Sequence, residues 1–517
     1  MDGPLAADRV GLLAPGRRPL ALASLCTLLF LTFLDNTVVS VALASIQQDL
    51  HGGVSALQWV VGGYALTFAS FMLVFGMMGD KLGRKKVMLA GACVYCVGAG
   101  LAAVASSIGM LIAARAVMGL GAAASEPGTL SMIRQLYPDE RSRNRALGVW
   151  AAVSGFSLAL GPVLGGALVG AWSWRGIFWF DVTFGLAALA VAALVLPESA
   201  EPGAGRIDVP GTVLGGGALA ALIFGIINGE SAGYAAPSVL ALFAASLVAG
   251  LAFVVWERRA PFPLLDLSYL RVPQFATPNV VAYCTYFATF AIFFFTALYL
   301  GVIAGYSAYH IAGLFLPMTV AMIVAALLAG RWATVVGTRW LLVAGCLLFA
   351  AGLLATNVVI SPSPAYLPLT AALGLAGVGI GTCVVPVTSS VLAAVPAARS
   401  GMAASATNTS REFGAVTGIA ILGAVVNAEL RSGLASRMTH LGASAALQQY
   451  VLQVIETGSV ALGQGSPTGN DPLDQIVRAG YAAFTSALHD ALYVSAALLA
   501  AAALLSAITL RPRRTTE

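Results

Sequence analysis

The sequence predicts an all-α membrane protein with many spans, and two observations carry this prediction. Of the 517 residues, 59% are hydrophobic and only 9% are charged, whereas about 25% of the residues of an average soluble domain are charged. The apolar runs are continuous over about 20 residues or more, which is the length that a helix needs to cross a bilayer. The strands of an outer-membrane barrel would instead alternate polar and apolar residues, so we expect helices.

Charged or Pro/Gly-rich connectors divide the apolar runs into fourteen predicted spans. These lie near 20–45, 57–78, 86–106, 109–133, 146–170, 176–196, 210–228, 237–256, 275–300, 308–330, 340–360, 366–395, 402–428 and 483–509. An even number of spans puts both termini on one side. The other side carries only four basic residues, Arg175, Arg431, Arg437 and Arg478. Because Lys and Arg concentrate in cytoplasmic loops, both termini are predicted to be cytoplasmic.

A short internal repeat predicts how the spans are grouped. The loops after the second and the tenth span share two glycines and a cation at the same spacing: Gly76, Gly83 and Lys85, and Gly330, Gly337 and Arg339. Many transporters are built from duplicated halves, so we expect two six-helix halves with two inserted helices between them. The predicted division is a tail 1–19, an N-terminal half 20–196, a linker 197–274 with inserted helices near 210–228 and 237–256, a C-terminal half 275–509 with an outer loop 429–482, and a tail 510–517.

Four stretches resemble signatures of the major facilitator superfamily, and within it of the fourteen-span drug:proton antiporters. They are LDNTVVSVAL at 34–43, the loop from Gly76 to Lys86, RAVMGLGAA at 115–123 and GPVLGG at 161–166. The resemblance implies the major facilitator fold and a secondary transporter, not an enzyme. It also implies proton-coupled export of amphipathic drugs or antibiotics across the bacterial plasma membrane by alternating access. Small molecules, protons and lipid are the implied partners of a monomer, with no nucleic acid and no cofactor.

Five charged residues within the spans are candidates for proton coupling: Asp35, Arg115, Glu126, Arg411 and Glu412. Each charge in hydrocarbon costs about 2.5–3.5 kcal/mol on insertion scales and is usually retained for a function. Asp35 and Arg115 reach similar depths from opposite sides, so they can pair across the first and fourth spans. Losing that pair would raise the proton affinity of Asp35, which suits an antiporter. The alternative is a static structural ion pair.

The other three charges leave more than one interpretation open. Glu126 shares a helix face with Arg115, since residues 11 apart differ by only about 20° in direction, and the adjacent Pro127 favours a kink. Glu126 is a second proton site or a cation contact, or else it reaches the inner membrane interface. Arg411 and Glu412 point about 100° apart, so one of them can serve coupling and either can instead bind neighbouring helices.

Two glycine-containing motifs predict moving parts. By the resemblance, the inner loop gates the change between inward and outward states through Gly76, Asp80, Gly83 and Arg84; a plain topology signal is the alternative. A cluster in the fifth span predicts close helix approach and a bend, and the resemblance marks it as an exporter feature. Its members are Gly155, Gly161, Pro162, Gly165 and Gly166.

Aromatic residues concentrate in the second and ninth spans and are candidates for a substrate pocket, because pockets for bulky amphipathic ligands are mostly apolar. Lipid-facing rings would look the same in sequence. The predicted substrate contacts are Asn36, Trp59, Tyr64, Phe68, Tyr286, Phe290 and Phe294.

Several other classes of function are disfavoured by motifs that the sequence lacks. No lysine precedes Ser or Thr, so there is no GxxxxGK[ST] loop for direct ATP drive. Cys93 and Cys96 form a CxxC without a second pair, so no metal site is expected. An alternative function is export of one endogenous metabolite, siderophore or lipid. A remote alternative is an intramembrane enzyme or sensor, for which neither HExxH nor GxSxG is present.

Overall fold

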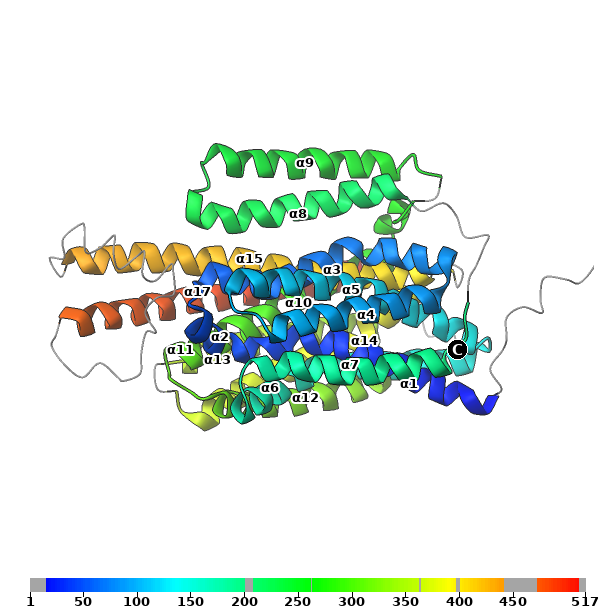
Figure 1. Cartoon of the computed structure of the whole chain (residues 1–517), viewed down its shortest axis with the longest axis horizontal. Helices are drawn as coiled ribbons and strands as arrows, with labels where there is room; N and C mark the ends of the chain where they lie inside the picture. The colour runs from blue at the N-terminus through cyan, green and yellow to red at the C-terminus, as the bar shows by residue number, and fades with distance from the viewer. Residues whose placement is uncertain are drawn as a thin grey trace, which may run out of the picture.

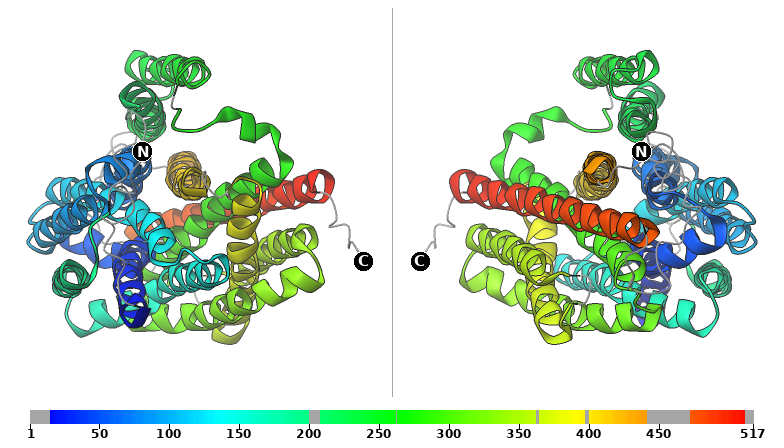
Figure 2. Two further views of the ribbon diagram at one scale, coloured as in Figure 1. Left: turned by 90° about the vertical axis from the view of Figure 1, so that its right-hand side faces the viewer. Right: turned by 90° about the vertical axis from the view of Figure 1, so that its left-hand side faces the viewer.

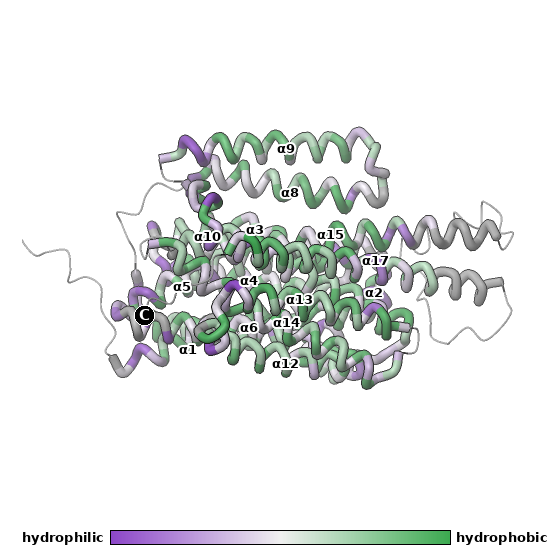
Figure 3. The backbone as a smooth tube through the Cα atoms, turned by 180° about the vertical axis from the view of Figure 1, so that it is seen from behind, coloured by the Kyte–Doolittle hydropathy of each residue, from purple (hydrophilic) through white to green (hydrophobic). Residues whose placement is uncertain are grey.

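The structure is a computed structural model that describes residues 15–199, 208–261, 263–361, 364–396, 400–440 and 472–510. This part of the chain forms a bundle of long, roughly aligned helices (Figure 1). Figure 3 shows hydrophobic backbone along most of the helices and hydrophilic segments mainly near their ends. The all-helical fold predicted from the sequence is therefore confirmed.

The N-terminal helices cover residues 15–195. In order they are η1 (Pro15–Arg17), α1 (Arg18–Val38), η2 (Val39–Ala42), α2 (Leu43–Leu50), α3 (Val54–Leu82), α4 (Arg84–Ala103), α5 (Ile108–Leu136), α6 (Glu140–Ala171) and α7 (Arg175–Val195). Side chains cap two of these helices at the places where the chain must turn. Ser107 accepts a hydrogen bond from the backbone N–H of Met110, and Asp139 accepts one from that of Ser142, so the first turns of α5 and α6 each gain a partner.

The remaining helices cover residues 209–509. They are α8 (Val209–Ala232), α9 (Pro237–Glu257), η3 (Leu267–Arg271), α10 (Pro273–Phe290), the π-helical η4 (Ala291–Thr296), α11 (Ala297–Val302), α12 (Ala308–Val335), α13 (Thr338–Val359), α14 (Tyr366–Ala393), α15 (Ser400–His440) and α17 (Pro472–Thr509). The π-helical turn is notable because such turns are frequent at functional sites.

Thirteen of the described helical segments are long and apolar enough to cross a membrane. Helix α3 is not one of the thirteen, but it has 29 residues and lies in the bundle beside α5 (Figure 1). Its charged residues, Asp80 and Lys81, fall in its last turn. Each of the fourteen predicted spans thus coincides with a helix or, for the first and ninth spans, with consecutive helical segments of the structure.

Views along the bundle show how the helices are grouped (Figure 2). The N-terminal helices gather on one side and the helices from α10 to α17 on the other, while α8 and α9 stand outside both groups as a pair. The two groups meet through α6 with α12 and α3 with α15. The hydroxyl of Thr319 in α12 donates to the carbonyl oxygen of Ala159 in α6 at 2.6 Å. Function by two moving halves, with the predicted domain boundaries, stays a prediction.

Helices extend into the predicted outer loop 429–482. The candidate spans end at Glu429 and begin again at Ala482, while α15 continues to His440 and α17 begins at Pro472. Residues 441–471, including the centre of that loop, lie outside the described residues, as do 1–14 and 511–517 of the predicted tails. The apolar pattern ends near 428, whereas α15 continues to His440. Hydropathy therefore predicts where the membrane-crossing part ends, but it does not predict where the helix ends.

Candidate functional site

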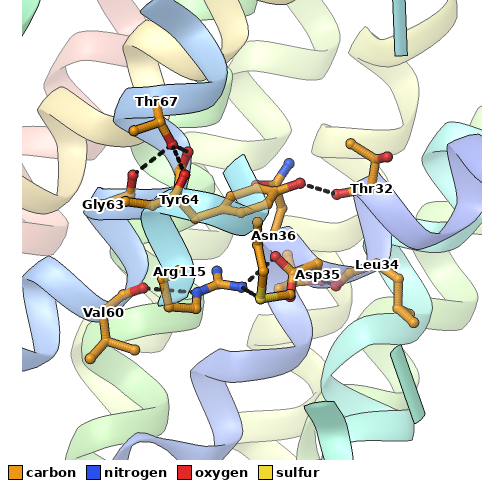
Figure 4. Close-up of polar contacts among 12 residues, drawn as sticks. Thr32, Leu34, Asp35, Asn36, Val60, Gly63, Tyr64, Thr67 and Arg115 are labelled. Atoms are coloured by element: carbon orange, nitrogen blue, oxygen red, sulfur yellow. Dashed lines mark hydrogen bonds and ion pairs between the residues drawn. The ribbon is translucent and has the colours of Figure 1, made fainter. Parts of the chain in front are cut away.

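The predicted ion pair between the first and fourth spans is present in the structure. Asp35 in α1 and Arg115 in α5 are both fully buried. Arg115 Nη1 donates to Asp35 Oδ2 at 2.5 Å, and Arg115 Nε donates to the carbonyl oxygen of Val60 in α3 at 2.9 Å (Figure 4). The pair therefore joins three helices in an apolar interior, where a charge without a partner is costly.

An aromatic ring covers the guanidinium of this pair. The Cζ atom of Arg115 lies 4.6 Å from the ring centroid of Tyr64, a distance typical of a cation–π contact. The Tyr64 hydroxyl donates to the carbonyl oxygen of Thr32 at 3.0 Å (Figure 4). Asp35 Oδ1 and Arg115 Nη2 have no hydrogen-bond partner within the described part of the chain, so each member of the pair keeps unused bonding capacity.

Two hydrogen bonds between buried side chains connect the N-terminal to the C-terminal helices. Asn36, next to Asp35 in α1, donates through Nδ2 to Glu412 Oε1 of α15 at 3.2 Å. Asn408 of α15 donates through Nδ2 to Glu126 Oε1 of α5 at 2.7 Å. The helices that carry the ion pair, α1 and α5, are thus both bonded to α15.

Arg411 binds helices of its own group. Its Nη1 donates to Asn408 Oδ1 at 3.2 Å, its Nη2 donates to Thr388 Oγ1 of α14 at 2.8 Å, and its Cζ lies 5.6 Å from the ring centroid of Tyr286 in α10. Glu412 instead reaches across to α1. The two neighbours therefore point to different partners, as their angular separation predicted.

Glu126 does not reach the membrane interface. Its side chain is 1% exposed and bonded to Asn408, while its Oε2 lacks a hydrogen-bond partner among the described residues. Pro127 follows it inside α5, and the hydroxyl of Thr129 donates to the Glu126 carbonyl oxygen. Of the interpretations open for Glu126, the interfacial one is thus excluded.

The inner loop of the predicted gate is bound to the chain that follows α7. Gly83 has φ +116°, a conformation that favours glycine. The Arg84 backbone N–H donates to the Ser199 carbonyl oxygen at 2.8 Å, and Lys85 N–H donates to Glu198 Oε1 at 3.2 Å. A Cβ on Gly76 would lie 3.4 Å from Pro127. The Asp80 side chain lies outside what the structure describes, so its role stays a prediction.

The glycines of α6 permit close helix approach, though not at every position. A Cβ on Gly161 would overlap Thr37, and one on Gly165 would overlap the Val38 carbonyl oxygen, so both glycines face α1. Gly166 faces α12, where a Cβ would overlap Ala312. A Cβ on Gly155 would lie 3.9 Å from Val384 of α14, an ordinary contact. Helix α6 continues through Pro162.

The predicted aromatic pocket residues fall into four places. Tyr64 lies beside the ion pair, Phe68 packs on Tyr64 with ring centroids 5.7 Å apart, and Tyr286 lies beside Arg411. Phe290 and Phe294 lie at and within the π-helical turn, and all five of these rings are buried, which excludes the lipid-facing alternative for them. Trp59 instead contacts Phe224 of α8 at 4.5 Å between centroids, so its ring faces the inserted helices.

Sequence reasoning missed two polar residues of this region. Asn408, which bonds both Glu126 and Arg411, is uncharged and was not among the predicted site residues, although its place three residues before Arg411 was a signal that could have found it. Asp181 is a fully buried acid near the start of α7, and its place inside the predicted span 176–196 was a signal that could have found it. An acid near the end of a span resembles an interfacial residue until the neighbouring helices are known.

The chain is similar to several known transport and resistance proteins. The sequence profile of the Major Facilitator Superfamily matches residues 25–419. The multidrug resistance protein Stp of Mycobacterium tuberculosis is 32% identical over 78% of this chain and 75% of its own length. The methylenomycin A resistance protein of Bacillus subtilis is 34% identical over 76% and 84% of the two chains. The multidrug efflux pump LfrA of Mycolicibacterium smegmatis is 29% identical over 96% and 97%.

A solved structure supports the fold independently. The chain resembles a bacterial homologue of the human lysosomal transporter Spinster, solved in an inward-facing, unoccupied conformation, with a TM-score of 0.61 and 15% identity over 95% of this chain and 97% of that one. Together with its bacterial relatives, this makes the protein a multi-span transporter of the bacterial plasma membrane and not an enzyme. The chain belongs to the major facilitator superfamily.

Proposed function

We propose that the protein exports amphipathic drugs or antibiotics from the bacterial cytoplasm in exchange for protons. The observation that carries this proposal is the buried pair of Asp35 and Arg115, placed one residue from a hydrogen bond that links α1 to the C-terminal helices. Relatives named for multidrug or antibiotic resistance support the substrate class. The proton-motive force is the proposed energy source, with no cofactor, and the proposed working unit is a monomer.

Protonation of Asp35 is the proposed trigger of the conformational change. The ion pair favours ionised Asp35, so a proton that binds there removes the attraction to Arg115. Asn36 follows Asp35 in α1 and bonds Glu412, so a movement of α1 at Asp35 also disturbs its bond to α15. One proton that enters across about 100 mV contributes about 2.3 kcal/mol, which is enough to drive a steep substrate gradient.

The bonded acids between the helix groups are the proposed place for the polar part of a substrate. Glu126 and Glu412 each keep one oxygen that has no partner in the described structure, and the aromatic ring of Tyr286 is buried nearby against Arg411. Carboxylate oxygens beside aromatic surface suit an amphipathic cation, because the acids attract its charge and the rings cover its apolar part.

Proton movement in liposomes tests this proposal. The purified protein is reconstituted with a pH-sensitive dye inside, and the amphipathic aromatic cation ethidium is added. We expect ethidium movement to change the internal pH with the wild type and not with Asp35→Asn. The matched control is Asp49→Asn, since Asp49 is 47% exposed and pairs with Arg175 at the outer end of α2.

The two variants separate loss of coupling from loss of the protein. Asp49→Asn makes the same chemical change away from the buried pair, so it should keep substrate-driven proton movement. The proposal would be wrong if Asp35→Asn retained that movement at the wild-type rate, or if the wild type moved substrate without protons.

A further inference from the structure

Asp181 is a buried acid that the proposed cycle has not yet used. It is fully buried in α7, and neither of its carboxyl oxygens has a hydrogen-bond partner within the described residues. Burial of a polar group without such a partner is unfavourable, so an acid in this position needs an explanation. Apolar packing does not supply one, because an alanine or a leucine would fill a helix face without that cost.

The packing of α7 shows what Asp181 faces. Gly185 lies one turn further along the same face, and a Cβ there would lie 2.7 Å from Cys96 Sγ of α4 and 3.4 Å from Leu31 Cδ1 of α1. Tyr95 adjoins Cys96, and Asp35 lies one turn beyond Leu31. Figure 1 shows α7 alongside α1 and α4. This face of α7 therefore points toward α1, which carries Asp35, and toward α4, which carries Tyr95.

The charges around Asp181 leave it without a cation of its own. It interacts with the charges of Asp35 and Arg115 and lies within reach of the Tyr95 hydroxyl, a neutral hydrogen-bond donor; the Tyr95 hydroxyl has no other hydrogen-bond partner in the described part of the chain. The titratable groups on the helices that surround this site are Asp35 of α1, Tyr64 of α3, Tyr95 and Cys96 of α4, and Arg115 of α5. Arg115 is the cation of this group, and Asp35 already pairs with it.

We propose that Asp181 is a second acid of the coupling site, which holds a proton while Asp35 pairs with Arg115 and becomes the counter-ion of Arg115 when Asp35 is protonated. This inference deepens the proposed function and rests on it. The unused Arg115 Nη2 provides a donor for the new pair.

The exchange balances in atoms and charge. The O–H bond of the Asp181 carboxyl breaks, its proton forms an O–H bond on Asp35, and the electron pair stays on Asp181 as a carboxylate. Arg115 remains a protonated guanidinium throughout, so the site stays neutral while the ion pair passes from one acid to the other. Asp35 can then leave Arg115 without exposing a buried, uncompensated cation.

Infrared spectroscopy can test the protonation state without relying on transport. Protonated carboxyls have a carbonyl stretch distinct from that of carboxylates, and ¹³C-labelled aspartate identifies the bands that belong to aspartate. Asp208 also has a buried oxygen with no partner in the described structure, so every spectrum is recorded in an Asp208→Asn background. We expect a protonated-aspartate band in this parent, reconstituted in lipid at neutral pH.

Two substitutions then test the exchange itself. Asp181→Asn should abolish the band, because it removes the acid. Asp35→Asn should abolish it as well, because Asp181 then ionises to pair with Arg115. The control Asp49→Asn should leave it intact.

The inference would be overturned if the parent showed no such band, if the band survived in Asp181→Asn, or if it survived in Asp35→Asn. The parent keeps both Asp181 and Asp35, so its spectrum tests the inference even if a variant at either residue fails to fold. Ethidium-driven proton movement is measured on the same liposomes. Absence of this movement in the wild type would contradict the proposed exporter function. If the wild type moves protons but the band survives in Asp181→Asn or Asp35→Asn, only the role of Asp181 is wrong.

Discussion

The contact between α6 and α12 offers a quantitative test of alternating access. Gly166 of α6 faces α12, and a Cβ on it would overlap Ala312 and lie 2.6 Å from the Ala308 carbonyl oxygen. Backbone cannot move aside as a flexible side chain can, so Gly166→Ala should strain the conformation in which these outer helix ends touch. Overpacking of this kind costs about 1–3 kcal/mol.

That cost predicts a change in the population of conformations. If the outer ends of α6 and α12 separate during the cycle, the separated state is relieved of the strain. A difference of 1–3 kcal/mol changes the ratio of two states by about 5-fold to 150-fold. Gly166→Ala should therefore increase the outward-open population by at least the lower of these factors.

A matched substitution in the same helix isolates the effect of the contact. Gly155→Ala brings the same gain in helix propensity, about 1 kcal/mol, but its Cβ meets only Val384 at 3.9 Å. We therefore expect Gly155→Ala to leave the population nearly unchanged. The difference between the two variants reports the contact between α6 and α12, because the gain in propensity is common to both.

Distance measurements between spin labels can read these populations. Trp172 at the end of α6 and Leu367 near the start of α14 are both 76% exposed, so labels there should disturb little packing. Label pairs at these sites, in a background without the six native cysteines, should show a longer-distance population that grows in Gly166→Ala. Equal distance distributions in Gly166→Ala and Gly155→Ala would show that the contact between α6 and α12 does not bias the conformations.

Three further predictions concern other parts of the chain. Asn408→Ala removes the partner of Glu126 Oε1 and one partner of Arg411. Since an unsatisfied buried group costs about 1–3 kcal/mol, thermal unfolding of Asn408→Ala should occur at a lower temperature than that of the wild type, and an unchanged unfolding temperature would contradict these contacts. In a double-mutant cycle, the effects of Trp59→Ala and Phe224→Ala on the free energy of unfolding should be coupled by about 0.5–1.5 kcal/mol, because the two rings pack between α3 and α8. If the two effects simply add, the contact does not contribute to stability. The Ser142 backbone N–H holds the pKa of Asp139 below its usual range. This cap therefore stabilises the fold above the ordinary carboxylate pKa, and its contribution is lost as the pH falls through the lower pKa of the folded state. Asp139→Ala should reduce the difference between the melting temperatures at neutral and acidic pH, and an unchanged difference would show that the cap does not contribute.

The sequence was sufficient for the parts of the site that depend on depth within one span. Asp35 and Arg115 could be paired because residue counting places them at similar depths from opposite sides, and the structure confirms the pair. The close approach at Gly161 and Gly165 was likewise expected, since small residues in a span permit it. The divergence of Arg411 and Glu412 followed from helical geometry alone.

The sequence was not sufficient where the result depends on how separate helices are rotated and placed. The bonds from Asn36 to Glu412 and from Asn408 to Glu126 join residues hundreds of positions apart, and no periodicity records such a pairing. Trp59 has helical spacing with Tyr64 and Phe68, yet it faces α8, because the position of the inserted helices is a tertiary property. Asp181 was missed for the same reason: its burial comes from α1 and α4.

The most direct test of proton coupling at Asp35 compares two kinds of transport in one preparation. Substrate exchange across liposomes, with ethidium on both sides and no pH gradient, needs binding and conformational change but no net proton movement. Efflux driven by an imposed pH gradient needs proton coupling as well. If Asp35 couples the proton, Asp35→Asn retains exchange and loses the acceleration by the gradient. Acceleration as large as in the wild type would show that the proton is coupled elsewhere.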